Sequence, residues 1–560
     1  MDKTNVRELQ DVVIRFSGDS GDGMQLTGTL FSDTSALLGN GISTFPDYPA
    51  EIRAPQGTVA GVSGFQVHFG SHRELNPGDY CDVLVAMNPA ALKANRKWLK
   101  PGATVIIDGD SITEDHLKKA CFATLDPIAE LKLDEYNVVI PGITTMTRDA
   151  LRETGLDNKS VTKCKNMFAL GICFYLFDRP EAYAFKYIET KFAKKNPAIA
   201  EANKLAIQAG YNYAANTHQF ANTYTVAPAP LEKGTYRSIS GNVATAWGLC
   251  AAAEKAGLPL FCGSYPITPA TVILEELAKR KDLGVKTVQA EDEIAGICTA
   301  IGAAFAGNFA VTTTSGPGLS LKSEALGLAV MTELPLVVVD VQRGGPSTGL
   351  PTKTEQSDLA QALYGRNGEC PVIVVAASSP SDCFHYAFEA GRLAMEHMTP
   401  VILLTDGFIA NGSEPWRIPA MKDYPAITPP IVDEAPEGGF MPYVRNENLA
   451  RGWAFPGKTG LEHRVGGLEK DCVKGCISHD PSNHQKMVRT RAEKVAKAVD
   501  DIPAQAVWGA PEGDLLVVGW GGTRGHLQNA VDQMRAEGKR VSLCHFNSVS
   551  YTHLTLPTIY

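Results

Sequence analysis

The strongest constraint on the fold is an alternation of short β-branched runs with Ala-rich stretches, which repeats through most of the 560 residues. The runs are VVIRF, DVLVAM, ATVIID, FAVTTT, LPLVVVDV, PVILLTD and DLLVVGW. They are apolar throughout rather than at every second residue, which is typical of parallel strands covered by helices on both faces. The alternation therefore predicts an α/β protein, and the length predicts about three domains.

Charge and composition exclude several classes of partner. The net charge is −9, and acidic and basic residues are interspersed, so no basic stripe is available to neutralise a phosphate backbone. No apolar run approaches the roughly 18 residues of a membrane helix, and the N-terminal residues lack the apolar region of a signal peptide. The twelve cysteines are scattered, as buried thiols of a reducing compartment are. We expect a cytoplasmic protein that binds neither nucleic acid nor membrane.

Changes in composition predict six segments. The first opens with a strand and a Gly-rich turn, a polar connector with Pro228 and Pro230 follows, and the third has the most regular α/β alternation. A stretch rich in Gly, Pro and charge then precedes a last α/β block with few elements. The predicted segments are 8–212 (domain), 213–234 (linker), 235–413 (domain), 414–483 (irregular arm or insertion), 484–547 (start of a truncated domain) and 548–560 (tail).

The tail abandons the α/β rhythm. Val549 to Thr558 resembles an in-frame translation of a sequencing adapter, so we expect residues 548–560 to be non-native and exclude them from the fold. The native chain is accordingly expected to be longer.

The first candidate site residue is Thr268, in the run GSYPITPAT. Pro266 and Pro269 restrict the backbone on either side of it, so the turn can hold a hydroxyl still against a ligand. A stiff connection in which Thr268 merely caps the next helix explains the same residues equally well.

Three acids, Glu291, Asp292 and Glu293, stand where an apolar strand meets a helix rich in Gly and Ala. Acids at a helix start ordinarily complement the helix dipole and the unpaired amides. Ile294 and Ile297 are expected to surround Glu293 with apolar side chains, however, and a carboxyl in such surroundings tends to stay protonated. A protonated carboxyl can donate a hydrogen bond to a bound ligand.

Arg343 directly follows the apolar run LPLVVVDV and Gln342. Its guanidinium is expected at the carboxyl end of a strand, the edge at which open parallel sheets bind ligands. There it can bind a carboxylate through two parallel hydrogen bonds. A solvated or structural role is the more common one for a single arginine in this position.

Several motifs occur in a diagnostic order. GNVATAWG, YPITPAT, QAEDEIAG, TTTSGPG and VQRGGPSTGLPT resemble domain I of the 2-oxoacid:ferredoxin oxidoreductases, specifically the alpha subunit of the 2-oxoglutarate type. GDSGDGMQLTG and FPDYPAEIRAPQG are similar to the two signatures of that family's gamma domain. The resemblance covers nearly all of residues 8–547. It implies a Rossmann-like gamma domain, a pyrimidine-type thiamine-diphosphate-binding domain and a truncated transketolase-C-like domain.

The resemblance also implies roles for single residues. The family's activating glutamate, which hydrogen-bonds the thiamine pyrimidine, falls on Glu293, and its substrate-binding threonine and arginine fall on Thr268 and Arg343. The neighbouring residues expected to contact the cofactor are Tyr265, Pro266 and Ile267.

The implied reaction is oxidative decarboxylation of 2-oxoglutarate with coenzyme A, giving succinyl-CoA, carbon dioxide and reduced ferredoxin. In that family a beta subunit binds the diphosphate through Mg²⁺. This chain has no convincing diphosphate motif and no C-x2-C-x2-C run, so a [4Fe-4S] cluster is also expected on the beta subunit. The expected partners are that subunit, in an (alpha-beta)2 heterotetramer, and ferredoxin. Two alternatives stay open: pyruvate or another 2-oxoacid as substrate, or a noncatalytic scaffold, which the presence of Glu293 disfavours.

Two further patterns are ambiguous or weak. Gly18, Gly21 and Gly23 either expose backbone to an anion such as part of coenzyme A or only allow the next helix to pack. Cys472 and Cys476 are spaced C-x3-C without a matching second pair, which is poor spacing for zinc. No metal site is expected.

Overall fold

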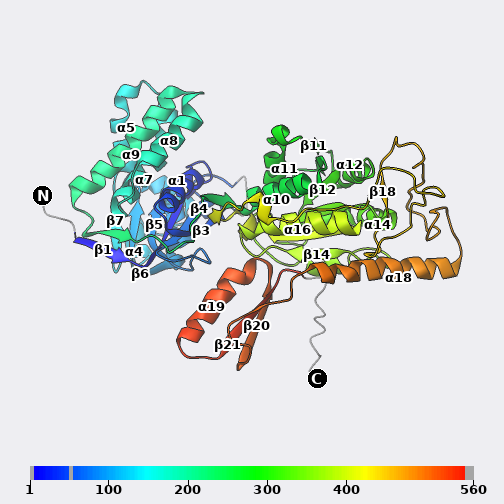
Figure 1. Cartoon of the computed structure of the whole chain (residues 1–560). Helices are drawn as coiled ribbons and strands as arrows, with labels where there is room; N and C mark the ends of the chain where they lie inside the picture. The colour runs from blue at the N-terminus through cyan, green and yellow to red at the C-terminus, as the bar shows by residue number, and fades with distance from the viewer. Residues whose placement is uncertain (1–4, 50–53, 549–560) are drawn as a thin grey trace. The chain divides into compact units, whose positions relative to one another are not determined.

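The computed structural model describes residues 5–49 and 54–548. They form two compact units, Met1–Ser238 with Gly412–Arg417 and Ile239–Asn411 with Ile418–Tyr560 (Figure 1). Residues 549–560 of the expected tail, and residues 50–53 within the second gamma-type signature, lie outside the described residues. The second unit holds both the second and the third predicted domains, and the boundary between those two stays a prediction.

A mixed six-stranded sheet forms the centre of the first unit, in the order β3-β4-β2-β5-β6-β7. Its strands are β2 (Asp11–Asp19), β3 (Gly41–Asp47), β4 (Val62–Gly70), β5 (Cys81–Ala86), β6 (Leu99–Ile107) and β7 (Asn137–Val139). β4 pairs antiparallel with both β2 and β3, whereas β2, β5, β6 and β7 run parallel.

Both faces of this sheet are covered, as the unbroken apolar runs predict. Val12 and Phe16 of β2 enter a core shared with the helices α1 (Met24–Leu37), α7 (Lys165–Leu176) and α9 (Pro197–Thr217). Val13, between them, enters a separate core with α2 (Pro89–Asn95). Alternate residues of one strand point to opposite faces, so two helical layers use the same run.

Residues 213–234 have more regular structure than their composition indicates. The segment contains the end of α9 and the strand β8 (Asn222–Val226), which pairs in parallel with β1 (Asn5–Leu9). Phe220 and Val226 are buried in the core of the first unit. This part of the expected linker is therefore ordered, because its backbone and the start of the chain satisfy each other's hydrogen bonds.

The second unit is built on six parallel strands in the order β11-β10-β12-β13-β15-β14. They are β10 (Leu260–Ser264), β11 (Lys286–Gln289), β12 (Phe309–Thr314), β13 (Leu336–Gln342), β14 (Ile373–Ala376) and β15 (Pro400–Asp406). The predicted runs FAVTTT and PVILLTD coincide with β12 and β15 residue for residue.

Helices cover this sheet on both sides (Figure 1). α12 (Glu293–Phe305) and α14 (Ser323–Thr332) share one core with Ala310 of β12. On the other face α10 (Gly241–Ala256) and α16 (Asp382–His397) pack together so closely that a Cβ on Gly391 would lie 2.8 Å from both Ala252 and the Phe309 ring. The small residues of the Ala-rich stretches are thus what lets the helices approach each other and the sheet.

The last block has its own three-stranded sheet, in the order β19-β21-β20. Its elements are α18 (Pro481–Lys497), β19 (Val507–Trp508), β20 (Leu515–Trp520), α19 (Arg524–Ala536) and β21 (Val541–Phe546). Asn547 attaches it to the parallel sheet: its Nδ2 donates to the Ala376 carbonyl at 2.9 Å, and its own carbonyl accepts from the Ala376 amide at 2.6 Å. Gly522 also packs beside the buried Asp406 carboxylate. Burial raises the pKa of Asp406 to about 6. Among residues 5–49 and 54–548, no helix combines the length and apolar character needed to cross a membrane.

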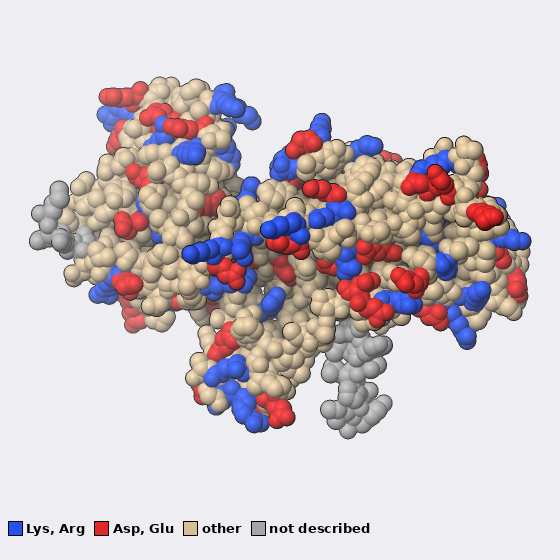
Figure 2. All heavy atoms as spheres, in the orientation of Figure 1, with Lys and Arg blue, Asp and Glu red and all other residues tan. Residues whose placement is uncertain are grey.

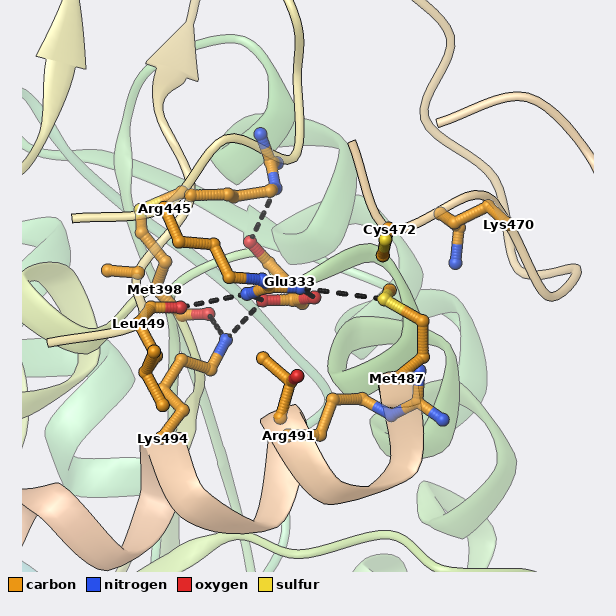
Figure 3. Close-up of polar contacts among 12 residues, drawn as sticks. Glu333, Met398, Arg445, Leu449, Lys470, Cys472, Met487, Arg491 and Lys494 are labelled. Atoms are coloured by element: carbon orange, nitrogen blue, oxygen red, sulfur yellow. Dashed lines mark hydrogen bonds and ion pairs between the residues drawn. The ribbon is translucent and has the colours of Figure 1, made fainter. Parts of the chain in front are cut away.

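A buried carboxylate at the end of α14 organises the irregular arm. Glu333 is 0% exposed, and Arg445 donates to both of its carboxylate oxygens at 2.6 Å (Figure 3). Lys494, which projects from α18, donates to the same group at 2.6 Å. These two cations hold the pKa of Glu333 far below its usual range despite the burial.

The same helix end also binds cations through its backbone. Arg451 Nε donates to the Thr332 and Glu333 carbonyls at 3.1 Å, and Lys470 Nζ donates to the Met331 carbonyl at 2.8 Å. The last carbonyls of a helix lack intrahelical partners and carry its negative dipole end, so cations are favourable there. After β16 (Ser413–Arg417), the described residues of the arm form only the short strands β17 (Ile431–Val432) and β18 (Trp453–Ala454). This part of the arm is therefore held by charge at the C-terminus of α14.

Replacement of Glu333 by Gln should destabilise the second unit. The exchange leaves Arg445 and Lys494 buried without a counter-charge, which costs about 3–5 kcal/mol. We expect a clearly lower melting temperature for the unfolding step of this unit in calorimetry. Glu434→Gln, at an exposed position of the arm, is the matched control and should melt like the parent. Equal melting temperatures for both variants would contradict the proposed network.

Candidate active site

Parallel strands bring the sequence-predicted residues to one edge of the second sheet. Thr268 follows β10, Glu293 follows β11, and Arg343 follows β13. Arg343 Nη1 donates a hydrogen bond to the Thr268 carbonyl at 2.8 Å, although β12 lies between β10 and β13 in the sheet. The turn YPITP and the arginine are thus joined, while the Thr268 side chain is exposed.

Glu293 and its acidic neighbours have different roles. Asp292 is the N-cap of α12, and its carboxylate accepts the Ala295 amide at 2.7 Å. Glu291 is exposed. Glu293, the first helical residue, is only 9% exposed, and a Cβ on Gly318 would lie 2.9 Å from its Cγ. Asp292 therefore caps the helix, and Gly318, the second glycine of TTTSGPG, leaves the space that the Glu293 side chain occupies.

The expected apolar surroundings of Glu293 are only half present. Ile297 is 0% exposed and belongs to the core under α12. Ile294, however, is 49% exposed, so the expectation that it covers Glu293 is wrong. Successive residues at the start of a helix point about 100° apart, and only Ile297 faces the sheet.

The prediction that Thr268 might act as a helix cap is also wrong. α11 (Thr271–Ala278) begins three residues later, and Ala270 occupies its cap position. The main-chain oxygen of Thr268 binds Arg343 instead. Tyr265 is 37% exposed, and Pro266 and Ile267 are half-buried in the same turn. Their contact with a cofactor stays a prediction.

Arg343 is held in a partly desolvated position. It is 7% exposed, and burial lowers the pKa of its guanidinium, while the carboxylates of Glu293 and Asp358 oppose that shift. Its buried Nε has no hydrogen-bond partner among the described residues. A buried guanidinium N–H without an acceptor is costly, so a ligand carboxylate that accepts from Arg343 would be favoured here.

Two acids that the sequence analysis did not single out lie beneath this edge. Asp340 of β13 is 0% exposed, and the carboxyl group of Asp358 lies beside it. Burial and the neighbouring Asp358 raise the pKa of Asp340 well above its usual range. Two ionised carboxylates offer only acceptors, so the pair is stable with one shared proton. A lone acid inside the apolar run LPLVVVDV was the sequence signal for it.

A buried lysine was also missed. Lys322, between α13 (Gly316–Leu321) and α14, is 0% exposed, and its Nζ donates to the Glu293 carbonyl at 2.7 Å. The signal was a single cation in the otherwise apolar run GLSLKSEALGLAV. Periodicity did not distinguish it from a solvated lysine.

Two patterns remain: the glycines of the first Gly-rich turn, whose contact with an anion stays a prediction, and the cysteines spaced C-x3-C. A Cβ on Gly18 would lie 2.8 Å from an Asp22 carboxylate oxygen, and one on Gly23 would lie 2.5 Å from Asn166, so close packing explains both glycines. Cys472 and Cys476 have free thiols. Among residues 5–49 and 54–548, no group of three or more His, Cys, Asp or Glu side chains is arranged to hold a metal ion.

Known families match both units. The model described as "Pyruvate flavodoxin/ferredoxin oxidoreductase, thiamine diP-bdg" matches residues 252–477, and "Pyruvate ferredoxin/flavodoxin oxidoreductase" matches residues 13–213. The 2-oxoglutarate oxidoreductase subunit KorA of Mycobacterium tuberculosis is 53% identical over 541 residues, which cover 96% of this chain and 82% of the relative. The 2-oxoglutarate synthase subunit KorA of Methanothermobacter marburgensis is 36% identical over 319 residues, 55% of this chain and 80% of the relative.

A solved structure extends the similarity to three dimensions. The 2-oxoglutarate:ferredoxin oxidoreductase from Magnetococcus marinus, with 2-oxoglutarate, coenzyme A and succinyl-CoA bound, superposes with a TM-score of 0.82 at 33% identity. The match covers 96% of this chain and 88% of that one. The chain belongs to the 2-oxoacid:ferredoxin oxidoreductase family. Along nearly its whole length it is similar to a 2-oxoglutarate oxidoreductase subunit, and the two family models match separate parts of the chain.

Replacement of Asp340 by Asn should remove a pH dependence of stability. Because the pKa of Asp340 is raised above 3.8, the native protein keeps a proton there at pH values at which the unfolded chain has lost it. The stability of the fold therefore falls as the pH rises from 3.8 towards the pKa of the native residue. Asn supplies the hydrogen-bond donor without titrating. We expect the melting temperature to decline less than in the parent as the pH is raised above 3.8, the usual pKa of an aspartate. Asp423→Asn, at an exposed position, should keep the parental slope, and an equal slope in both variants would refute the shared proton.

Proposed function

We propose that this chain is the alpha subunit that carries the pyrimidine side of a thiamine-dependent 2-oxoglutarate:ferredoxin oxidoreductase. The reaction converts 2-oxoglutarate, coenzyme A and two oxidised ferredoxins to succinyl-CoA, carbon dioxide, two reduced ferredoxins and the proton released from the coenzyme A thiol. The observation that carries the proposal is the convergence of Thr268, Glu293 and Arg343 at one sheet edge. It is supported by the similarity of the chain to an oxidoreductase subunit and to a solved oxidoreductase that are both named for 2-oxoglutarate.

The residues at this edge fit the pyrimidine half of thiamine diphosphate. The ring is flat and apolar on its faces and has nitrogen acceptors on its rim. Glu293 offers a largely buried carboxyl for a ring nitrogen, and exposed apolar side chains stand on three neighbouring connections: Tyr265 after β10, Ile294 after β11 and Leu321 after β12. Such side chains are favourable only if a ligand or partner covers them.

Bound thiamine diphosphate supplies the carbon nucleophile for a 2-oxoacid carbonyl and accepts the electron pair left when carbon dioxide departs. Glu293 holds a proton at the pyrimidine nitrogen, and Tyr265, Pro266 and Ile267 hold the ring. Arg343 pairs with the substrate carboxylate through its free Nε, and Thr268 orients the carbonyl. Arg343 and Thr268 contribute by orienting the substrate, which converts binding energy into rate.

The diphosphate and the electron carrier belong on a partner in this proposal. A beta subunit binds the diphosphate through Mg²⁺ and carries a [4Fe-4S] cluster that passes single electrons to ferredoxin. The two subunits assemble as (alpha-beta)2 in the cytoplasm. On the visible face, acidic and basic side chains are intermixed without a continuous basic stripe, which supports a protein partner rather than a nucleic acid (Figure 2).

Pyruvate is the second candidate substrate, because both matching family models are described by it. A panel of 2-oxoacids with viologen reduction as the readout separates the two. We expect 2-oxoglutarate to give the highest kcat/KM in the complex with the beta subunit. A higher kcat/KM for pyruvate would overturn the substrate assignment and leave the reaction class intact.

Replacement of Glu293 by Gln should abolish most turnover in the assembled complex. The amide cannot act as the proton donor and acceptor at the pyrimidine nitrogen, and general acid-base groups contribute about 10²- to 10⁴-fold. We expect a fall in kcat of at least about 100-fold in stopped-flow decarboxylation assays. Glu291→Gln, two residues away and exposed, controls for charge and should retain parental activity. A Glu293→Gln complex that turns over at the parental rate would exclude the assigned role.

Replacement of Arg343 by Lys should mainly weaken substrate binding. Lysine keeps the charge but loses the planar pair of N–H donors, and a hydrogen bond to a charged group contributes about 1.5–3 kcal/mol. We expect KM for 2-oxoglutarate to rise by about 10- to 100-fold. The control is Arg489→Lys on the exposed side of α18. An unchanged KM would show that Arg343 does not meet the substrate carboxylate.

A further inference from the structure

Lys322 occupies an unusual position directly behind the candidate catalytic glutamate. Its side chain is 0% exposed, and Nζ donates to the main-chain carbonyl of Glu293 at 2.7 Å and to Thr312 Oγ1 at 3.2 Å. Lys322 directly precedes α14, and its side chain therefore links the start of that helix to the first residue of α12 and to the strand β12.

The position is electrostatically unfavourable for the fold. A cation at the N-terminal end of a helix opposes the helix dipole, and an ammonium group loses its hydration when it is buried. Burial lowers the pKa of Lys322 to about 8. The negative charges of Glu293 and Asp292 oppose this shift and favour the charged form of Lys322. Stability alone does not explain a lysine here, because an apolar side chain of similar length would fill the same space.

We propose that Lys322 is a positioning residue that fixes Glu293 for its contact with the thiamine pyrimidine. The proposal rests on the function assigned to Glu293 above. Two elements hold residue 293 from opposite ends: Lys322 binds its carbonyl oxygen, and the backbone of Gly318 lies against its Cγ. Helix ends fray readily, and Glu293 is the first residue of α12. An extra bond to its carbonyl restrains that first turn, and with it the direction in which the carboxyl points.

Positioning matters here because proton transfer to a ring nitrogen depends steeply on distance. A misplacement of about 1 Å in a catalytic group can cost about 100-fold in rate. Lys322 does not touch the substrate in this scheme. Its loss should therefore lower kcat and the population of the imino form of the bound cofactor, and leave KM for 2-oxoglutarate unchanged.

Replacement of Lys322 by Met in the complex with the beta subunit tests the proposal. Three measurements are needed: kcat and KM for 2-oxoglutarate, the near-ultraviolet circular dichroism of the imino tautomer of bound thiamine diphosphate, and the melting temperature. We expect kcat to fall by about tenfold or more, the imino signal to decrease, KM to stay the same, and the melting temperature to be equal or higher. Lys281→Met, at an exposed position, is the control and should change none of these.

The outcomes separate positioning from a structural role. An unchanged kcat and imino signal in Lys322→Met would overturn the proposal, as would a fall in kcat that only accompanies a lower melting temperature. If the methionine variant fails to assemble, Lys322→Leu also removes the donor to the Glu293 carbonyl, and parental kcat in that variant would equally overturn the proposal. Failure of the proposed function is distinguishable, because then the Glu293→Gln complex would itself retain its turnover and its imino signal.

Discussion

Parallel hydrogen bonding in the sheet β11-β10-β12-β13-β15-β14 is the constraint on which the rest of the second unit depends. Every strand ends at the same edge, so the connections after β10, β11, β12 and β13 meet there whatever their separation along the chain. That edge receives Thr268, Glu293, Gly318 and Arg343. Because both faces are covered by helices, the edge is the part of the sheet that remains available to a ligand.

Buried charge is used in opposite ways at two helix ends of this unit. At the C-terminus of α14, cations from the arm and α18 meet unpaired carbonyls and the Glu333 carboxylate, and dipole and charge act together. At the N-terminus of α12, Lys322 opposes the dipole and is balanced by Glu293 and Asp292. The first arrangement stabilises the fold and joins the irregular arm to it. The second costs stability at the place where we assign chemistry, which is where such a cost is expected.

The candidate site has the features of one half of a shared pocket. Glu293 is largely buried, yet Ile294 beside it in the chain is exposed, as are Tyr265 and Leu321 after the neighbouring strands β10 and β12. The buried Arg343 Nε has no acceptor in the described structure. Each of these features is unfavourable on a surface that stays exposed to solvent. It becomes favourable when a cofactor, a substrate and a partner subunit cover this edge of the sheet. This physical incompleteness agrees with a family whose reaction needs a second subunit.

Local pattern alone determined the α/β class, the strands from VVIRF to DLLVVGW and the order of motifs that identifies the family, because apolar runs and Gly-rich turns depend on neighbouring residues. It also singled out Thr268, Glu293 and Arg343, although not the bond between Arg343 and the Thr268 carbonyl. Only the tertiary structure revealed Lys322, the Asp340 and Asp358 pair and the cations around Glu333, and it alone corrected Ile294. From the sequence alone, a charged residue is expected on the surface. Whether it is buried depends on the segments that pack against it, which are distant from it in the sequence.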